Sequence, residues 1–296
     1  MSLVIPKIEG RVHYGAPLAD ICWLRIGGKA EALISPANEG DFARLLGGLP
    51  QNIPVHIIGA GSNLLIRDGG VLGVVIRLGR GFSKIKRKNN ELIVGAAVLD
   101  GVLARFAYEE GLSGLEFYSG IPGTIGGALA MNAGAYGRET ADCLIRAIAL
   151  TRKGERVVLE GEDFGFQYRK NSLAEPLFFI EAVFSATPAE KPAIKKAMFE
   201  IDKKRKATQP VRAKTGGSTF RNPPNHKAWK LIEEAGGRGM REGGAQFSEQ
   251  HCNFLINHGN ASAADIEKLA EKIQKLVYQK KGITLEWEIQ RMGEAL

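Results

Sequence analysis

The sequence predicts an α+β fold in which a glycine-rich region reaches to about residue 188 and a smaller α+β domain follows it. Short apolar runs that are typical of strands alternate with stretches whose apolar residues recur at the helical period. The chain has 296 residues and 37 glycines, and many of the glycines gather around residues 59–70 and 120–137. At residues 187–193, two prolines and alternating charges indicate a linker between the two regions.

In the first region, apolar runs predict strands and two amphipathic stretches predict helices. The predicted strands are residues 30–36, 53–59, 74–78, 91–98, 144–151, 155–161 and 177–186. The predicted helices are residues 38–48 and 99–111, and each ends at glycine, which is common at a helix end. Lys153 and Gly154 form the expected turn between two paired strands.

Beyond the linker, the sequence predicts two helices and a final strand. Residues 193–207 form the first helix, and residues 262–282 form the clearest helix of the chain. Ser262 with Asp265 suits the N-cap of that second helix. Residues 283–289, "ITLEWEI", alternate between apolar and polar side chains, and this pattern predicts a strand.

The charge of the chain predicts an anionic partner. The formal net charge is +8, which would suit nucleic acid, a membrane surface or a phosphorylated small molecule. The basic stretches at residues 84–90 and 202–214 have no interleaved aromatic residues, whereas single-stranded nucleic acid is bound by basic and stacking side chains together. We therefore expect no nucleic-acid partner, and interpret these stretches as solvated surface or as a funnel for an anionic substrate.

The cysteines and histidines predict no metal site. The three cysteines are widely spaced and form no Cys-x-x-Cys pair, so we expect neither a disulfide framework nor a zinc site, and a reducing compartment. The five histidines show no metal-ligand spacing. His251 and Asn253 can line a cleft, with a hydrogen-bonded core histidine as the alternative.

Two features bear on localisation. The first residues lack the basic segment and long apolar core of a secretory signal, so we expect a cytoplasmic protein. Residues 117–137 carry no charge and are about as long as a membrane span. They contain six glycines and Pro122, which are poor helix formers, so we expect buried loops and turns that line a site and no membrane insertion.

The first glycine-rich loop begins like a dinucleotide-binding turn and then departs from it. It consists of Gly59, Ala60, Gly61, Ser62, Asn63 and Leu64, and the third glycine of that turn would fall at position 64. Paired glycines let successive backbone N–H groups converge on phosphate oxygens. Gly, Ser and Asn are also common turn residues, so an ordinary turn between strands is the alternative.

A second glycine-rich segment, residues 120–137, favours the phosphate interpretation. Its glycines surround Thr124 and expose backbone N–H groups. Two such segments in one region predict a large phosphate-bearing cofactor that is contacted at several points, with a close-packed helix–strand junction as the alternative. A third contact is expected at residues 23–31, where Arg25 places a cation beside two glycines.

Three other stretches are candidates for catalysis. Arg169 lies between apolar strands, where a guanidinium can hold a carboxylate or form a surface ion pair. Ser218 follows two glycines outside a Gly-x-Ser-x-Gly motif, which favours a proton donor or a helix cap over a nucleophile. Glu286 and Glu288 share one strand face, and we expect one to be exposed and the other to lie in a cleft, with a solvated face as the alternative.

Taken in order, six segments resemble the UDP-N-acetylenolpyruvoylglucosamine reductase family, flavoproteins of bacterial cell-wall precursor synthesis. The segments are "LRIGG", "GAGSNLL", "GIPGTIGGALAMNAGAYG", "YRKNS", "GGSTFRNP" and "LEWEI", which together span residues 24–289. The two glycine-rich segments would suit several flavoproteins of the vanillyl-alcohol-oxidase type. The serine motif and the C-terminal Glu-x-Glu narrow the resemblance to this reductase.

The resemblance implies an FAD-binding fold of the vanillyl-alcohol-oxidase type in two subdomains, residues 1–80 and 81–188, and a C-terminal α+β substrate-binding domain, residues 189–296. It implies non-covalent FAD, NADPH as co-substrate, and hydride transfer to the enolpyruvyl group of a UDP-sugar, which gives UDP-N-acetylmuramate. The implied FAD-binding residues are Arg25, Gly27, Gly59, Ala60, Gly61, Ser62, Asn63, Leu64, Gly120, Pro122, Gly123, Thr124, Gly126, Gly127 and Ala133.

The resemblance also implies roles at matching positions. Ser218 would donate a proton to the carbon next to the substrate carboxylate, Arg169 would hold that carboxylate, and Glu288 would stabilise the enolic intermediate from the other side. The implied substrate-binding residues are Tyr168, Lys206, Asn222, Gln246, His251 and Asn253, with Arg205 as the alternative to Lys206 near the diphosphate.

The chain departs from the family pattern at two positions. Arg221 stands where the family often has lysine, and Trp287 where it often has proline. Only 48 residues separate Arg169 from Ser218, which leaves little room for the substrate lid of one subclass. We therefore predict the lidless subclass, in which NADPH and substrate use one cleft in turn, and a monomer. The rival hypotheses are a related flavin oxidase and a nucleic-acid-binding module.

Overall fold

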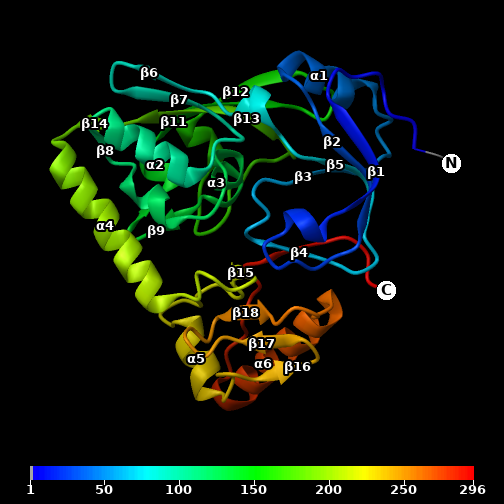
Figure 1. Cartoon of the computed structure of the whole chain (residues 1–296), viewed down its shortest axis with the longest axis vertical. Helices are drawn as coiled ribbons and strands as arrows, with labels where there is room; N and C mark the ends of the chain where they lie inside the picture. Colours follow the sequence, from blue (N-terminus) through cyan, green and yellow to red (C-terminus); the bar gives the residue numbers. More distant parts are fainter. Residues whose placement is uncertain (1–2) are drawn as a thin grey trace. The chain divides into compact units, whose positions relative to one another are not determined.

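The computed structural model describes residues 3–296, which group into two compact units (Figure 1). Unit 1 contains the chain up to His13 together with Ala32–Ala60 and Gly73–Lys204, and unit 2 contains Tyr14–Glu31, Gly61–Leu72 and Arg205–Leu296. Each unit therefore draws on separate stretches of the sequence. The functional division into residues 1–80, 81–188 and 189–296 stays a prediction.

Unit 1 is built around a five-stranded sheet of order β12-β11-β13-β7-β6 (Figure 1). Its strands are β6 (Ile85–Lys88), β7 (Glu91–Gly95), β11 (Leu144–Leu150), β12 (Arg156–Glu160) and β13 (Phe178–Ser185). All neighbouring strands are antiparallel. β7 and β13 are central and apolar, so the sheet can bury both of its faces.

Helices cover the two faces of this sheet, because successive strand residues point to opposite sides. Phe179 of β13 belongs to the core formed with α2 (Asp100–Glu109) and α3 (Ile125–Met131). The neighbouring Phe178 belongs to the core formed with α1 (Glu39–Gly48), where its ring meets that of Phe42 at 5.8 Å. The single strand β13 thus links two hydrophobic cores.

A second sheet has the order β1-β2-β5-β3. Its strands are β1 (Arg11–Pro17), β2 (Lys29–Ser35), β3 (Val55–Ile57) and β5 (Val71–Ile76). β3 runs parallel to β5, with Val55 opposite Val74. The first glycine-rich loop begins two residues after β3 ends, so the sheet determines where that loop starts.

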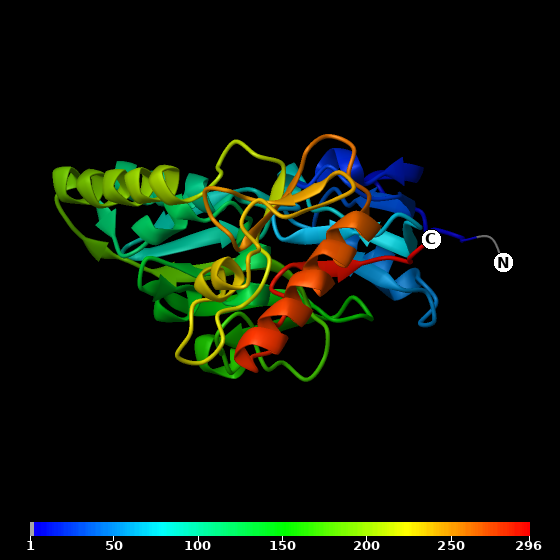
Figure 2. The same cartoon turned by 90° about the horizontal axis from the view of Figure 1, so that it is seen from below.

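Unit 2 contains a four-stranded sheet of order β15-β18-β17-β16 and two helices, of which α6 packs on β16 and β17 and α5 packs on α6. Its elements are β15 (Thr215–Ser218), α5 (Ala228–Glu234), β16 (Arg241–Glu242), β17 (Ala245–Phe247), β18 (Phe254–Asn257) and α6 (Ala263–Lys281). The orange-red helix α6 is best seen in Figure 2, beside the red C-terminal segment. That segment contains β19 (Gln290–Met292), which pairs in parallel with β4 (Leu64–Ile66).

Two side chains tie α6 to the residues that follow β4. Asp68 accepts hydrogen bonds from the backbone N–H groups of Ala263 and Ala264, at 2.9 and 3.1 Å. Arg67 forms an ion pair with Glu267 at 2.9 Å. A carboxylate at a helix N-terminus is stabilised by the unpaired N–H groups there, so Asp68 helps to hold residues 64–68 in place.

The remaining elements connect these layers. The long helix α4 (Lys191–Thr208) buries Ile194 and Ile201, as its sequence pattern predicts. The short strands are β8 (Leu112–Ser113), β9 (Gly134–Ala135), β10 (Arg138–Glu139) and β14 (Thr187–Pro188). The 3-10 helices are η1 (Ala19–Ile21), η2 (Arg80–Phe82), η3 (Glu116–Gly120), η4 (Thr140–Asp142) and η5 (Gly161–Phe164).

Most predicted elements are confirmed to within a few residues. The seven strands predicted in the first region correspond to β2, β3, β5, β7, β11, β12 and β13, and the predicted helices to α1, α2, α4 and α6. The N-cap of α6 is confirmed, because the side chain of Ser262 accepts a hydrogen bond from the N–H of Asp265. Strongly periodic segments were thus the most predictable ones.

Three local predictions are wrong. Residues 283–289 form no continuous strand, because only Trp287 makes a bridge, to Phe220, and the strand itself lies later, at β19. Residues 117–137 include the helix α3 as well as loops, because tertiary packing outweighs the low helix propensity of their glycines. Part of the predicted linker is paired, since β14 joins β8.

The buried carboxylate of Asp41 predicts a pH-dependent stability. It accepts hydrogen bonds from the backbone N–H groups of Glu9, Gly10 and Ala37, at 2.8, 2.9 and 2.9 Å. Burial alone would raise the pKa of Asp41, but these donors and Arg44 outweigh it and lower the pKa. Asp41→Asn should lower the free energy of unfolding at pH 7 by about 2 kcal/mol, the contribution of hydrogen bonds to a charged group.

A lowered pKa stabilises the fold above the unfolded-state pKa, and that stabilisation is lost as the pH falls through the folded-state value. Urea unfolding of the wild type and Asp41→Asn should therefore differ at pH 7 and converge in acid. The exposed Asp163→Asn serves as a control. The carboxylate of Asp163 accepts a main-chain hydrogen bond only locally, at the short helix η5. A difference that stayed constant down to about pH 3 would contradict the role of the charge.

Candidate active site

The second glycine-rich segment is fixed by pairing with the chain that leads into α2. The N–H of Asp100 donates to the carbonyl of Gly123 at 3.1 Å, and the N–H of Ile125 donates to Val98 at 3.0 Å. Thr124 then caps α3, because its side chain accepts from the N–H of Gly127. These bonds hold the main chain of residues 123–127 in a fixed position in unit 1, and we call this stretch the main-chain edge.

The first glycine-rich loop meets this edge at Gly59. A Cβ atom added to Gly59 would collide with Oγ1 of Thr124, so only glycine permits the approach. Both residues belong to unit 1. The beginning of the first glycine-rich loop therefore lies against the second segment. The sequence predicted both segments but no specific contact between them.

The loop that carries Arg169 is attached to the end of α3. The side chain of Asn132, which is fully buried, donates to the carbonyl of Gln167 at 3.2 Å. Asn171 donates to the carbonyl of Ala130 at 3.3 Å. Arg169 has a φ of 60°, a left-handed conformation that is uncommon outside glycine, and its guanidinium lies 5.0 Å from the ring of Tyr168.

In unit 2 the second half of the first loop lies beside the C-terminal glutamate segment. The side-chain amide of Asn63 donates to the carbonyl of Glu288 at 3.1 Å, and the N–H of Gln290 donates to the carbonyl of Asn63 at 3.0 Å. The N–H of Glu288 in turn donates to the carbonyl of Thr219 at 2.8 Å. Main-chain bonds thus connect the loop, Glu288 and the residue that follows Ser218.

Asn253 holds the serine segment from its other side. Its side-chain oxygen accepts from the N–H of Phe220 at 3.0 Å, and its side-chain nitrogen donates to the carbonyl of Phe220 at 2.8 Å. The carbonyl of Asn253 accepts from the N–H of Thr219 at 2.7 Å. With both ends of its amide used on the main chain, Asn253 fixes the position of Ser218, which pairs with Phe254 across the sheet.

The two candidate glutamates differ in exposure. Glu286 is exposed, and Glu288 is half-buried. Between them, Trp287 packs at 5.5 Å from the ring of Phe220, and the guanidinium of Arg291 lies 4.9 Å from the Trp287 ring. Trp287, which stands where the resemblance led us to expect proline, therefore packs against Phe220 and makes a cation–π contact with Arg291.

The other predicted substrate residues have definite partners. Burial lowers the pKa of His251, whose Nδ1 accepts from the N–H of Asn253 at 3.3 Å. Gln246 is 5% exposed and donates to the carbonyl of Gly239 at 3.3 Å. Asn222 accepts from the N–H of Ala228 at the start of α5, at 3.0 Å.

The third predicted contact lies next to the first loop. The N–H of Trp23 donates to the carbonyl of Gly61 at 3.0 Å. A Cβ atom added to Gly27 would approach Cβ of Ile66 to 2.5 Å. Arg25, with a φ of 56°, directs its guanidinium to the carbonyl of Asp20. The segment 23–27 therefore packs against residues 61–66, within unit 2.

The candidate residues thus fall into two groups, one in each unit. Unit 1 contains Gly59, Ala60, Gly120, Pro122, Gly123, Thr124, Gly126, Gly127, Ala133, Tyr168 and Arg169. Unit 2 contains Arg25, Gly27, Gly61, Ser62, Asn63, Leu64, Lys206, Ser218, Asn222, Gln246, His251, Asn253 and Glu288. Sequence reasoning missed the supporting roles of Thr219, Asn132 and Asn171, because bonds from side chains to distant main chain leave no local pattern.

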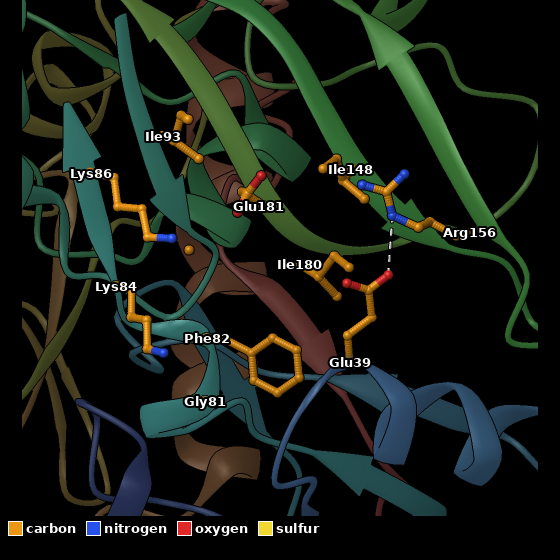
Figure 3. A pocket seen from close by; sticks show the side chains of 11 residues that line it. Glu39, Gly81, Phe82, Lys84, Lys86, Ile93, Ile148, Arg156, Ile180 and Glu181 are labelled. Atoms are coloured by element: carbon orange, nitrogen blue, oxygen red, sulfur yellow. Dashed lines mark ion pairs between the residues drawn. The ribbon is translucent and has the colours of Figure 1, made fainter. Parts of the chain in front are cut away.

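No group of three or more His, Cys, Asp or Glu side chains among residues 3–296 is arranged to hold a metal ion. A separate hollow of about 170 Å³ lies in unit 1, over the apolar side chains of Ile93, Ile148 and Ile180 (Figure 3). An ion pair of Arg156 with Glu39 at 3.1 Å closes one end of it. None of the candidate residues lines this hollow.

Known proteins resemble the chain along almost its whole length. Residues 209–292 match the family "UDP-N-acetylenolpyruvoylglucosamine reductase, C-terminal domain", and residues 30–160 match "FAD binding domain". The UDP-N-acetylenolpyruvoylglucosamine reductase of Parvibaculum lavamentivorans is 54% identical over 98% of this chain and 93% of the relative. The chain belongs to the UDP-N-acetylenolpyruvoylglucosamine reductase family.

Other members of this family agree with that assignment. The relative from Phenylobacterium zucineum is 52% identical, over 98% of this chain and 97% of its own length. The crystal structure of the reductase from Thermus caldophilus is 35% identical, with a TM-score of 0.86 over 96% of this chain and 100% of that one. The predicted fold class, an FAD-binding domain of the vanillyl-alcohol-oxidase type with a C-terminal domain, is confirmed.

The residues of unit 1 fit an FAD. The two glycine-rich segments approach each other closely enough that Gly59 can carry no side chain, and Gly126 lies where an added Cβ would be 3.3 Å from Ala96. The N–H groups of Ile125, Gly126 and Gly127 are bonded within unit 1, so what this edge offers a diphosphate is main chain without the steric hindrance of side chains. The geometry therefore suits the cofactor that the family requires.

Gly59→Ala tests the junction of the two glycine-rich segments. The added Cβ would push Thr124 away, so we expect the purified variant to bind FAD at least about tenfold more weakly, a cost of about 1.4 kcal/mol. Flavin fluorescence on titration of the apoprotein measures this affinity. Gly101→Ala is the matched control, because an added Cβ there meets no atom within 4 Å. Equal FAD affinities in the two variants would show that the close approach is unimportant.

Proposed function

We infer that the chain reduces UDP-N-acetylenolpyruvoylglucosamine to UDP-N-acetylmuramate, with FAD as its cofactor and NADPH as the source of the hydride. The observation that carries this conclusion is the match to the reductase family over 98% of the chain at 54% identity. The activity belongs to peptidoglycan precursor synthesis. The arrangement of the candidate residues within each unit supports the roles that follow.

FAD, when bound, transfers hydride from NADPH to the enolpyruvyl double bond. We propose that glycine-rich main chain and a few neighbouring side chains hold the FAD. The proposed residues are Gly59, Ala60, Gly120, Pro122, Gly123, Thr124, Gly126, Gly127 and Ala133 in unit 1, and Arg25, Gly27, Gly61, Ser62, Asn63 and Leu64 in unit 2. The glycines that follow Thr124 carry no side chains, which supports a close approach of the cofactor's phosphates to the main chain.

Ser218 is the proposed proton donor. When the terminal carbon of an enol ether gains hydride, negative charge develops on the carbon that bears the carboxylate, and that carbon must receive a proton. A donor is effective only if it is held in position. The four hydrogen bonds that fix Thr219 and Phe220 to Asn253 and Glu288 provide this rigidity for Ser218.

Arg169 and Glu288 are proposed to act on the charge that develops. A guanidinium can bind the substrate carboxylate through two parallel hydrogen bonds and withdraw negative charge from the reacting carbon. The left-handed backbone of Arg169 is the kind of local strain that accumulates at functional sites. Glu288 would stabilise the enolic intermediate, and its half-buried side chain suits that role better than exposed Glu286.

Binding of the UDP-sugar is proposed for Tyr168, Gln246, His251, Asn222 and Lys206, with Arg205 as the alternative near the diphosphate. Lys206 lies in the last turn of α4, where a helix C-terminus favours cations. For Asn253 we propose a positioning role in place of the predicted substrate contact. Its side-chain amide already bonds twice to Phe220.

We further propose the lidless subclass, with NADPH and the UDP-sugar using the same cleft in turn. Most of the chain between Arg169 and Ser218 is taken up by β13 and α4, which supports the absence of a lid. A cytoplasmic monomer is the proposed state, and Cys22, Cys143 and Cys252 are buried free thiols, as a reducing compartment favours. No helix within residues 3–296 is long and apolar enough to cross a membrane.

The activity and the role of Ser218 can be tested together under anaerobic conditions. Wild-type protein should consume NADPH beyond one equivalent of its bound flavin only when UDP-N-acetylenolpyruvoylglucosamine is present. In Ser218→Ala, reduction of the bound flavin by NADPH should survive, while its reoxidation by the substrate should slow by about 100-fold to 10,000-fold, the usual contribution of general acid catalysis. Stopped-flow absorbance separates the two half-reactions.

The exposed Ser83→Ala is the matched control and should leave both half-reactions unchanged. Equal slowing of both half-reactions in Ser218→Ala would contradict a proton-donor role. No substrate-dependent NADPH consumption in the wild type would contradict the proposed function itself, and an oxygen-dependent turnover would favour a flavin oxidase.

The two C-terminal glutamates provide a matched pair of variants. Glu288→Gln replaces the carboxyl group that is proposed to stabilise the enolic intermediate, so reoxidation by the substrate should slow by about 100-fold, as for loss of one electrostatic group. Glu286→Gln should react as the wild type does, because its side chain is exposed. If single-turnover measurements gave similar rates for the two variants, Glu288 would have no special role.

A further inference from the structure

The side chain of Asp100 is buried beneath the second glycine-rich segment. Asp100 is the first residue of α2 and is 1% exposed. Neither of its carboxyl oxygens has a hydrogen-bond partner within the described residues 3–296. Buried polar groups are nearly always paired, so this one requires an explanation.

Asp100 is in direct contact with Gly123. The N–H of Asp100 donates to the carbonyl of Gly123 at 3.1 Å. A Cβ atom added to Gly123 would lie 2.5 Å from Oδ2 and 3.6 Å from Cγ of Asp100. The carboxyl group therefore fills the space beside Gly123 that a side chain at position 123 would occupy.

The charge state of this carboxyl matters because of what the segment binds. An ionised carboxylate without a partner is very costly to bury, and such a group normally stays protonated. A negative charge beneath Gly123 would also repel the diphosphate of FAD, and low-dielectric surroundings would screen it poorly. Both effects favour the neutral acid.

We propose that Asp100 is a positioning residue for FAD, which stays a neutral carboxylic acid and supports Gly123 beneath the cofactor's diphosphate. The inference rests on the FAD-dependent function proposed above and adds a residue to the binding site. The shape of the side chain positions Gly123, and its proton keeps this position free of charge.

The groups that face Asp100 do not supply a counter-charge. Burial raises the pKa of Asp100 well above its usual range, and no charged neighbour contributes. Tyr118 of η3 is the titratable group close to it, and burial likewise raises the pKa of that phenol. Behind Tyr118, burial raises the pKa of Cys143 to about 12. The other acid of η3, Glu116, is bonded to Ser113 and Gly114.

A raised pKa gives a definite sign to the pH dependence of stability. The stabilisation is complete below the unfolded-state pKa and is lost as the pH rises towards the folded-state pKa. Asp100→Asn carries a similar side chain without a titrating group. Relative to this variant, the unfolding equilibrium constant of the wild type should increase about tenfold per pH unit as the pH rises above about 5 towards the folded-state pKa.

This experiment uses urea unfolding of the full chain with saturating FAD. A constant ratio between wild type and Asp100→Asn above about pH 5 would show that Asp100 is ionised in the fold, and would overturn the proposal. Because both proteins carry every other ionisable group, the ratio of their unfolding equilibrium constants reports only the ionisation of Asp100.

FAD affinity tests the positioning role. Asp100→Asn should bind FAD within about threefold of the wild type, and Asp100→Ala, which leaves Gly123 without support, at least about tenfold more weakly. Leu103→Ala is the control for a general loss of packing, because Leu103 is a fully buried residue of the same helix. It should lose stability and keep FAD affinity in the folded protein.

The outcomes separate the possible failures. Unchanged affinity in Asp100→Ala, or equal weakening in Leu103→Ala, would show that Asp100 does not position the segment. A loss of affinity in Asp100→Asn as large as in Asp100→Ala would show that the acid is needed for more than its shape. A wild-type protein that bound no FAD would instead contradict the proposed function.

Discussion

The hydrogen bonds that join Asn63, Glu288 and Thr219 are the constraint on which the candidate catalytic part of unit 2 depends. They connect three stretches that are far apart in the sequence, and each uses main-chain atoms on at least one side. Substitution of neighbouring side chains therefore leaves most of the connection intact. Ser218 and Glu288 owe their proximity to this connection, because neither lies in a helix or a long strand that could hold it alone.

In unit 1, main-chain pairing and two side-chain amides hold the glycine-rich segment and the Arg169 loop in position. Its glycine-rich segment is too poor in side chains to hold itself in place, and it pairs instead with residues 96–100, which continue from the central strand β7. The amides of Asn132 and Asn171 then attach the Arg169 loop to the end of α3. A well-packed sheet thus transmits its rigidity to loops that must present backbone to a ligand.

Polar groups inside both units serve this positioning. Asp41 and Asp68 are carboxylates that accept hydrogen bonds from backbone N–H groups, whereas Asp100 has no such donors within residues 3–296. The contrast follows from physical chemistry, since N–H donors favour the charged form and an apolar enclosure favours the neutral one. The same residue type therefore secures loops and helix ends in two cases, and in the third it is proposed to support the site of a negatively charged cofactor.

Local sequence patterns predict the strongly periodic elements and the glycine-rich segments, and the order of the motifs indicates the family and its chemistry. Local pattern is sufficient for these because strand and helix periods and turn residues act over a few neighbours. Only the folded structure shows that residues 283–289 form no ladder, that glycines 126 and 127 lie in a helix, and that the side chains of Asn253 and Asp100 lie against Phe220 and Gly123. Those features depend on which distant atoms supply hydrogen bonds or exclude water, and no local pattern in a sequence records that.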